Sequence, residues 1–224
     1  MKTFKAILTI TILSLLVTSC SKNEDTPAPP PPQPSAAAVY ENNTVFNILD
    51  AVKIVGSLNE CGSNTTPGTI FSPITISTDE IIKDASKLTI EIDISHQYAA
   101  EVVIELIAPS GESCGLLKRV YSTGDTACSS SAGIGAKYVA GNKLSFNSLY
   151  TNELGVGEII TGNYKTTAAT TGTFPAAVLM TTLNTFFTDK SIKGIWKLKA
   201  YDCAVGDLGK INAWKIKFDV GALK

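Results

Sequence analysis

The sequence predicts an all-β protein in which two antiparallel sheets pack face to face, with eight or nine strands. Three stretches, 88–94, 196–200 and 214–220, alternate apolar and polar residues with the period of two that is typical of half-buried strands. The segments between strands are rich in Thr, Ser and Asn, and the chain has 17 glycines. This composition favours turns between strands and indicates a secreted sheet module.

The end of the chain carries the most distinctive pattern. Strands predicted at 194–202 and 212–220 each place one tryptophan, Trp196 or Trp214, on the apolar face. We expect these strands to pair as an antiparallel hairpin, with both tryptophans packed in the core rather than stacked on sugars. The loop that joins them is acidic and rich in glycine.

Size and charge limit the possible functions. The chain has 224 residues, of which 44% are hydrophobic and 17% charged, so it can bury one sizeable core and fits one domain with appendages. Its formal net charge is -1. A chain so close to neutral gives no reason to expect nucleic acid or an anionic membrane surface as a partner.

Residues 1–19 resemble the signal peptide of a bacterial lipoprotein. A short basic start precedes an apolar run at 6–17 that is too short to span a bilayer, and V-T-S-C at 17–20 is similar to a lipobox. Cleavage there would leave Cys20 as the lipidated first residue; the alternative is a plain secretory signal. Several acyl chains give a stable anchor. We expect a Gram-negative outer membrane lipoprotein, exposed at the cell surface, with the lipid as its only membrane contact.

Three segments follow the signal peptide. Residues 20–38 form the lipid anchor and a proline-rich tether, whose composition favours an extended spacer. Residues 39–69 are predicted to be a lead-in that packs against the main domain. The β-sandwich itself is predicted to span 70–224.

A second distinctive stretch lies at 86–111. A strand at 88–94 is followed by H-Q-Y-A-A-E, then by a strand at 102–106 and a turn, A-P-S-G, with proline second and glycine fourth. This stretch and the final one are the two parts of the chain that carry recognisable motifs.

Both stretches are similar to the P domain (Homo B domain), which follows the catalytic domain in subtilisin-like proprotein convertases. The family pattern is roughly V-x-I-x-H-T-Y-x-G-D-L with S-P-S-G-T, and later G-x-W-x-L-x-x-x-D, G-D-x-G and N-x-W-x-[IL]-x-F. Ala100 replaces the glycine and Glu101 the aspartate of that pattern. The resemblance runs from 71 to 220 and implies a jelly-roll-like, galactose-binding-like sandwich. The positions that match and imply structural roles are His96, Tyr98, Pro109, Gly111, Trp196 and Trp214.

The cysteines indicate an oxidising compartment. Apart from Cys20 there are four, which allow three pairings, and the absence of C-x-x-C makes a zinc site improbable. Closeness in the sequence favours a Cys114–Cys128 pair. Cys61 and Cys203 then remain to join the beginning of the domain to its last loop.

No catalytic residue is predicted, and the chain is not expected to be an enzyme. His96 is the single histidine, and the chain has no G-x-S-x-G, H-E-x-x-H or phosphate-loop motif. A nucleophile with an activating base would need this one histidine. We expect His96 to be a hydrogen-bonded residue at a strand end.

Glu101, Asp202 and Asp207 are the candidate metal ligands. Loop carboxylates near a glycine-rich turn are the ligands that calcium prefers, and the resemblance implies calcium because some P domains bind it. The alternative is that the two aspartates only shape the loop by accepting backbone N–H groups. No cofactor is required for the fold that we predict.

Two functional classes remain open. The resemblance implies a non-catalytic module that binds or stabilises a protein partner, in association with a protease. The alternative is a carbohydrate-binding module, because sandwiches of this kind on surface lipoproteins often hold glycans and fold alone does not decide. Aromatic residues make up only 8% of the chain, and no exposed aromatic row is evident. We expect a protein partner at a sheet face or at the loops around Glu101 and Asp207.

Overall fold

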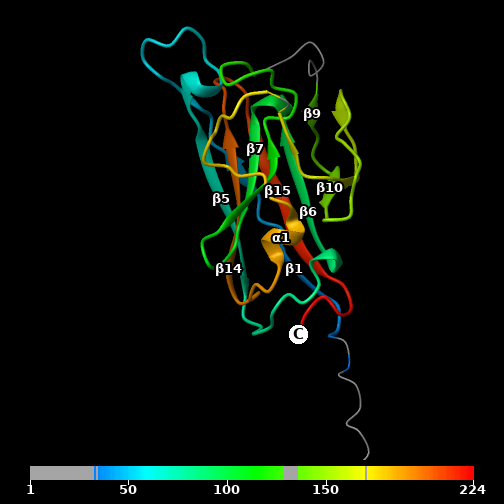
Figure 1. Ribbon diagram of the computed structural model, residues 1–224. Coiled ribbons are helices and arrows are strands. Elements are labelled where there is room, and N and C mark those ends of the chain that lie inside the picture. The colour runs from blue at the N-terminus through cyan, green and yellow to red at the C-terminus, as the bar shows by residue number, and fades with distance from the viewer. Residues whose placement is uncertain (1–32, 34, 129–135, 170) are drawn as a thin grey trace, which may run out of the picture. The chain divides into compact units, whose positions relative to one another are not determined.

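The computed structural model describes residues 33, 35–128, 136–169 and 171–224, and from residue 35 onward these form a β-sandwich of two main sheets (Figure 1). The all-β prediction is confirmed. Helical structure in the described residues is limited to three short 3-10 turns and α1 (Leu183–Phe187), and none of the described helices is long and apolar enough to cross a membrane. The predicted signal peptide, the predicted lipidation site at Cys20 and most of the tether lie outside the described residues.

The larger sheet has eight strands, with β15 and β6 at its centre. Its main order is β1-β15-β6-β10-β12; β2 also pairs with β15, and β9 links β6 to β11. The pairings of β15 with β1, β2 and β6 are all antiparallel. The strands are β1 (Ala38–Asn42), β2 (Phe46–Ile48), β6 (Leu88–His96), β9 (Lys137–Tyr138), β10 (Lys143–Phe146), β11 (Glu158–Ile159), β12 (Gly162–Tyr164) and β15 (Gly209–Phe218).

The second sheet has five strands in the order β13-β8-β7-β14-β5. These are β5 (Gly68–Ile76), β7 (Val102–Ile107), β8 (Ser113–Lys118), β13 (Thr167–Ala168) and β14 (Gly194–Asp202); β3 (Val52–Lys53) and β4 (Thr65–Thr66) form a separate small ribbon. The described residues thus contain fifteen strands, more than the predicted eight or nine. The excess arises because the loops and the lead-in segment add strands of two to five residues.

The last two strands do not pair as the predicted hairpin. β14 lies in the five-stranded sheet between β5 and β7, whereas β15 lies in the eight-stranded sheet. The chain therefore crosses from one sheet to the other between them. The apolar faces of both strands point into the space between the sheets. Because the strands belong to different sheets, the two tryptophans come from opposite layers of the sandwich.

Both tryptophans are buried between the sheets. Trp196 donates its indole N–H to the carbonyl oxygen of Ile192 (2.8 Å), and Trp214 donates to Ser72 Oγ (3.0 Å). Because Trp214 belongs to one sheet and Ser72 to the other, this hydrogen bond joins the two layers. Buried indole N–H groups need such partners, since an unpaired buried donor costs about 1–3 kcal/mol.

The predicted disulfides are wrong. The structure joins Cys61 to Cys128, with Cα atoms 5.7 Å apart, and leaves Cys114 and Cys203 as buried free thiols. Cys114 lies opposite Leu106, near the end of β7. The loop that carries Cys128 follows Lys118, which lies opposite Val103 near the start of β7. Closeness in the sequence was therefore misleading, because β8 carries the chain away from Cys114 before that loop begins.

Arg119 explains why Cys128 reaches Cys61 instead. The buried guanidinium donates to the carbonyl oxygens of Gly124 and Asp125 (3.2 and 3.1 Å) and to that of Ala127. These bonds fold the 124–128 loop around the arginine. On the other side, the backbone N–H of Ser63 donates to the Asp125 carbonyl (2.7 Å), so the loop meets the segment that carries Cys61.

Reducing the disulfide should lower the free energy of unfolding by roughly 4 kcal/mol, the loop-closure entropy expected for a span of this length. The two cysteines are 67 residues apart. Thermal unfolding with and without reductant measures the loss, and peptide mapping without reduction should recover Cys61 linked to Cys128. A linked Cys114–Cys128 peptide, or alkylation of Cys61 in the native protein, would contradict the structure.

Candidate metal centre

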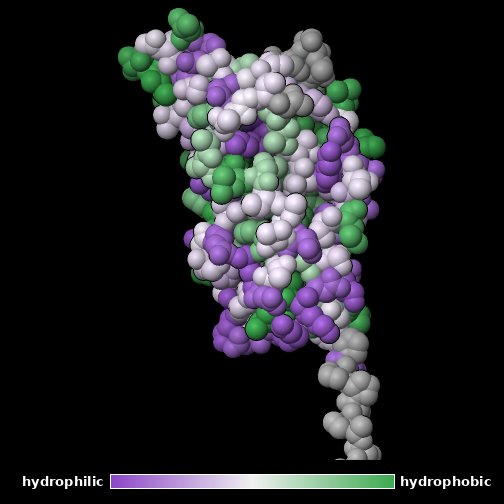
Figure 2. Space-filling model, in the orientation of Figure 1, coloured by the Kyte–Doolittle hydropathy of each residue, from purple (hydrophilic) through white to green (hydrophobic). Residues whose placement is uncertain are grey.

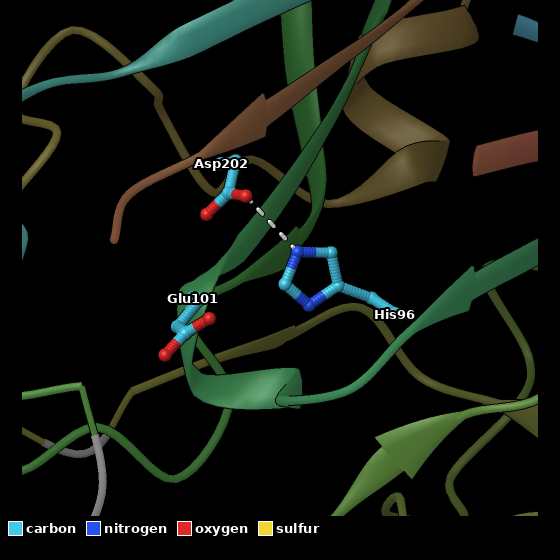
Figure 3. Close-up of side chains that lie close together, drawn as sticks. All are labelled: His96, Glu101 and Asp202. Carbon is cyan, nitrogen blue, oxygen red and sulfur yellow. Dashed lines mark hydrogen bonds and ion pairs between the residues drawn. The ribbon is translucent and has the colours of Figure 1, made fainter. Parts of the chain in front are cut away.

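A buried cluster of three chemically active side chains lies where the two sheets meet at one end of the sandwich (Figure 3). His96 is the last residue of β6, Glu101 ends the 3-10 turn Ala99–Glu101 that leads into β7, and Asp202 is the last residue of β14. The antiparallel register pairs Asp202 with Val102, the residue after Glu101. One ligand atom from each of the three lies within 4.8 Å of the others.

His96 has both ring nitrogens engaged. Nδ1 lies 3.1 Å from the carbonyl oxygen and 3.2 Å from the backbone nitrogen of Tyr98, and Nε2 lies 3.2 Å from Asp202 Oδ2. The ring also needs Gly209 of β15 beside it, because a Cβ atom there would lie 2.4 Å from the imidazole Cδ2. The second glycine of the G-D-x-G motif is thus required by close packing.

Glu101 is buried without a partner for one of its oxygens. Only 6% of the residue is exposed, and within the described part of the chain Oε2 has no hydrogen-bond donor. Burial, followed by the negative charges of Asp207 and Asp202, raises the pKa of Glu101 to about 8, against the opposing charge of Arg119. A bound cation would pair with this oxygen and would offset the repulsion between the neighbouring carboxylates.

Asp207 and Asp50 complete the acidic surroundings. Burial raises the pKa of Asp207; His96 acts in the opposite direction, and the charges of Asp202 and Asp50 raise it further. Asp50 accepts the backbone N–H of Gly206 at 3.1 and 3.2 Å, so it lies against the loop that bears Asp207. Asp50 was not among the predicted residues, since nothing in its local sequence pattern indicates a contact 156 residues away.

The predicted ligands are thus partly brought together. Glu101 and Asp202 belong to the buried cluster, while Asp207 is near enough for its charge to act on Glu101 but is not one of the three clustered groups. Asp202 Oδ1 also accepts the backbone N–H of Ala204 (3.0 Å), as the loop-shaping alternative expects. The two interpretations are compatible for Asp202, because its other oxygen points to His96.

The donor set fits a hard divalent cation. Both ring nitrogens of His96 already contact protein atoms, Nδ1 the backbone of Tyr98 and Nε2 the Asp202 carboxylate, and the other ligand atoms of the cluster are carboxylate oxygens. Oxygen-only sites suit calcium or magnesium, whereas zinc prefers nitrogen and sulfur. His96 would then hold the Asp202 carboxylate in position rather than bind the ion itself.

The remaining motif residues lie apart from this cluster. Pro109 and Gly111 form a turn closed by the Gly111 N–H donating to the Ala108 carbonyl (2.9 Å), where the φ of Gly111 is 91°. That angle belongs to the left-handed region, which favours glycine. Tyr98 is hydrogen-bonded to His96 through its backbone, and the residue is 40% exposed.

No protein-family model and no curated protein sequence matches this chain. It is similar to the crystal structure of a serine protease of Aeromonas sobria, at 16% identity and a TM-score of 0.35, over 78% of this chain and 27% of that one. The complex of that protease with its chaperone gives 15% identity and a TM-score of 0.34, over 81% and 27%. This chain therefore spans about a quarter of the length of those neighbours.

Without a divalent cation, the protein should lose stability as the pH rises. The pKa of Glu101 is raised from 4.5 to about 8 in the folded state. Its contribution to the free energy of unfolding is therefore full below about pH 4.5 and is lost as the pH rises to about 8. Thermal unfolding in EDTA across this range measures the loss. Glu101→Gln should flatten the profile, and an equally steep profile in that variant would contradict the assignment.

Excess calcium should raise the melting temperature, by about 5–10 °C at a hundred times the dissociation constant, because only the folded state binds it. Asp207→Asn and Glu101→Gln should each abolish or sharply reduce this rise. The matched control is Asp189→Asn, an exposed carboxylate paired with Lys224. An equal rise in all variants, or none in the wild type, would leave only the loop-shaping role.

Proposed function

We propose that this chain is a non-catalytic binding module of P-domain type that binds or stabilises a protein partner, such as a separately encoded protease. A lipid on Cys20 would hold it at the bacterial surface, and a calcium ion at Glu101, Asp202 and Asp207 would stabilise it. The observation that carries the proposal is the engagement of His96, the single histidine, in the interior.

The surroundings of His96 support a structural role over catalysis. Its side chain and that of Asp202 are both 0% exposed, and its two nitrogens are occupied by the Tyr98 backbone and by Asp202. A general base must reach the proton that it abstracts, directly or through one water. Because the imidazole is fully buried and both of its nitrogens contact protein atoms, a structural role for His96 is favoured over a catalytic one.

The outer face of the five-stranded sheet favours a protein over a glycan. Phe71 and Tyr201 lie on this face, and Lys199 Nζ lies 5.5 Å from the first ring centre and 4.2 Å from the second. Lys197 Nζ lies 5.9 Å from the ring of Phe71. Sugars stack on open aromatic faces, so a glycan would have to displace these cation–π contacts.

The test of the proposed function is capture with the full-length lipoprotein from the cell envelope and medium of its host, run beside a glycan array. We expect a specific protein to be retained and the array to stay empty. Reproducible glycan binding that is lost in Tyr201→Ala would favour the carbohydrate module instead. Hydrolysis of any substrate by the purified protein would contradict both.

The anchor is tested separately by Cys20→Ala. We expect this variant to leave the membrane fraction and appear in soluble fractions, because the acyl chains are the proposed membrane contact. Fractionation followed by immunoblotting measures the shift. A variant that stays as firmly bound to membranes as the wild type would refute lipid anchoring at this position.

A further inference from the structure

Four exposed aliphatic residues project from one end of the sandwich. They lie in and just after β3, and we call them the apolar tip: Val52, Ile54, Val55 and Leu58. Val55 is 100% exposed and Leu58 97% exposed. Figure 2 shows hydrophobic atoms gathered at the upper left, where Figure 1 places this loop. Exposed apolar patches of this kind mark interaction sites.

The apolar tip is held in a defined conformation. The backbone N–H of Ile54 donates to the Asn64 carbonyl (2.8 Å), and that of Ser57 donates to the Ile54 carbonyl (3.1 Å) in a turn where Gly56 has a φ of 87°. The disulfide at Cys61 fixes the segment that follows. A loop needed only as a connection would be expected to carry polar residues, so these aliphatic side chains call for an explanation.

The loop between β14 and β15, which carries Asp207, is hydrogen-bonded to the chain on both sides of the apolar tip. Asp50, before the tip, accepts the N–H of Gly206, and the Glu60 carbonyl, after it, accepts the N–H of Val205 (3.0 Å). The N–H of Gly62 donates to the Cys203 carbonyl (2.7 Å). The position of the apolar tip therefore depends on the loop between β14 and β15.

The charges around the apolar tip indicate the chemistry of its partner. Asp50, Glu60 and Asp125 all belong to segments bonded to one another at this end, and the basic residue within the tip, Lys53, is 3.6 Å from Glu60. A negative surround opposes contact with an anionic lipid surface and complements a basic one.

The path of the chain also favours a partner other than the anchoring membrane. Ser35, where the tether enters the sandwich, accepts the backbone N–H of Leu223 (3.1 Å) near the C-terminus. Figure 1 places the C-terminus at the opposite end of the sandwich from the loop between β3 and β4. The apolar tip thus faces away from the point of tether entry.

We propose that the apolar tip is a docking element that inserts into an apolar groove with a basic rim on a partner protein. This inference rests on the proposed function and names the contact surface and the kind of partner. Burial of Val55 and Leu58 supplies the affinity, and the acidic surround sets the orientation. Aliphatic side chains that leave water on binding contribute in proportion to the area buried.

The first experiment places a photo-activatable amino acid at position 55 of the full-length protein in its native host. The matched control is position 160, where Ile160 is a 65% exposed aliphatic residue on another part of the sandwich. We expect a discrete adduct with a different protein from position 55 alone. An adduct of twice the chain mass, a lipid adduct, equal labelling from position 160 or no adduct would overturn the proposal.

The second experiment measures the affinity of the purified partner for the full-length protein. Val55→Ser with Leu58→Ser should raise the Kd by about 100-fold, while Val156→Ser with Ile160→Ser should leave it unchanged. Added salt should weaken binding, and the cross-linked peptide should line an apolar groove bordered by Lys or Arg. Melting temperatures of both variants should match the wild type, because all four side chains are exposed.

The two proposals fail in different ways. A captured partner whose Kd is the same for the tip variant would overturn the apolar tip as docking element while the proposed function stands. Failure of the wild-type protein to retain any partner, together with glycan binding, would overturn the proposed function itself.

Discussion

The hydrogen bond between His96 and Asp202 joins the two sheets at the end where the functional loops lie. His96 ends a strand of the eight-stranded sheet, and Asp202 ends a strand of the five-stranded sheet. Both side chains are fully buried, so removing either partner would leave a polar group without water or a hydrogen bond. The positions of the loops that follow these strands depend on this contact.

Crowding of carboxylates is the electrostatic consequence of that arrangement. The register that pairs β14 with β7 brings Asp202 beside Glu101, and the crossing to β15 brings Asp207 to the same end. Burial of several like charges disfavours their ionised forms, which is why the pKa of Glu101 is raised to about 8. Burying the Glu101 carboxyl lowers the free energy of unfolding at neutral pH unless a bound cation offsets this cost.

The packing between the two sheets leaves one apolar segment outside the interior. The interior accounts for both tryptophans and for the alternating faces of β6, β7, β14 and β15. The segment between β3 and β4 lies outside that interior, yet it is tied to the loop after β14 by backbone hydrogen bonds. A cation bound at Glu101 and Asp202 would fix the loop after β14, and through these hydrogen bonds it would also fix the segment that carries Val55 and Leu58.

The sequence by itself determined which residues form the main strands and which faces are buried, because the period of two follows directly from the geometry of a strand. It also indicated Glu101 and Asp202 as acidic residues in a common region. Only the tertiary structure decided that β14 and β15 lie in different sheets, that Cys61 joins Cys128, and that Asp50 reaches the acidic loop. Backbone hydrogen bonds are the same for any pair of strands, so the choice among pairings depends on how side chains from distant segments pack together.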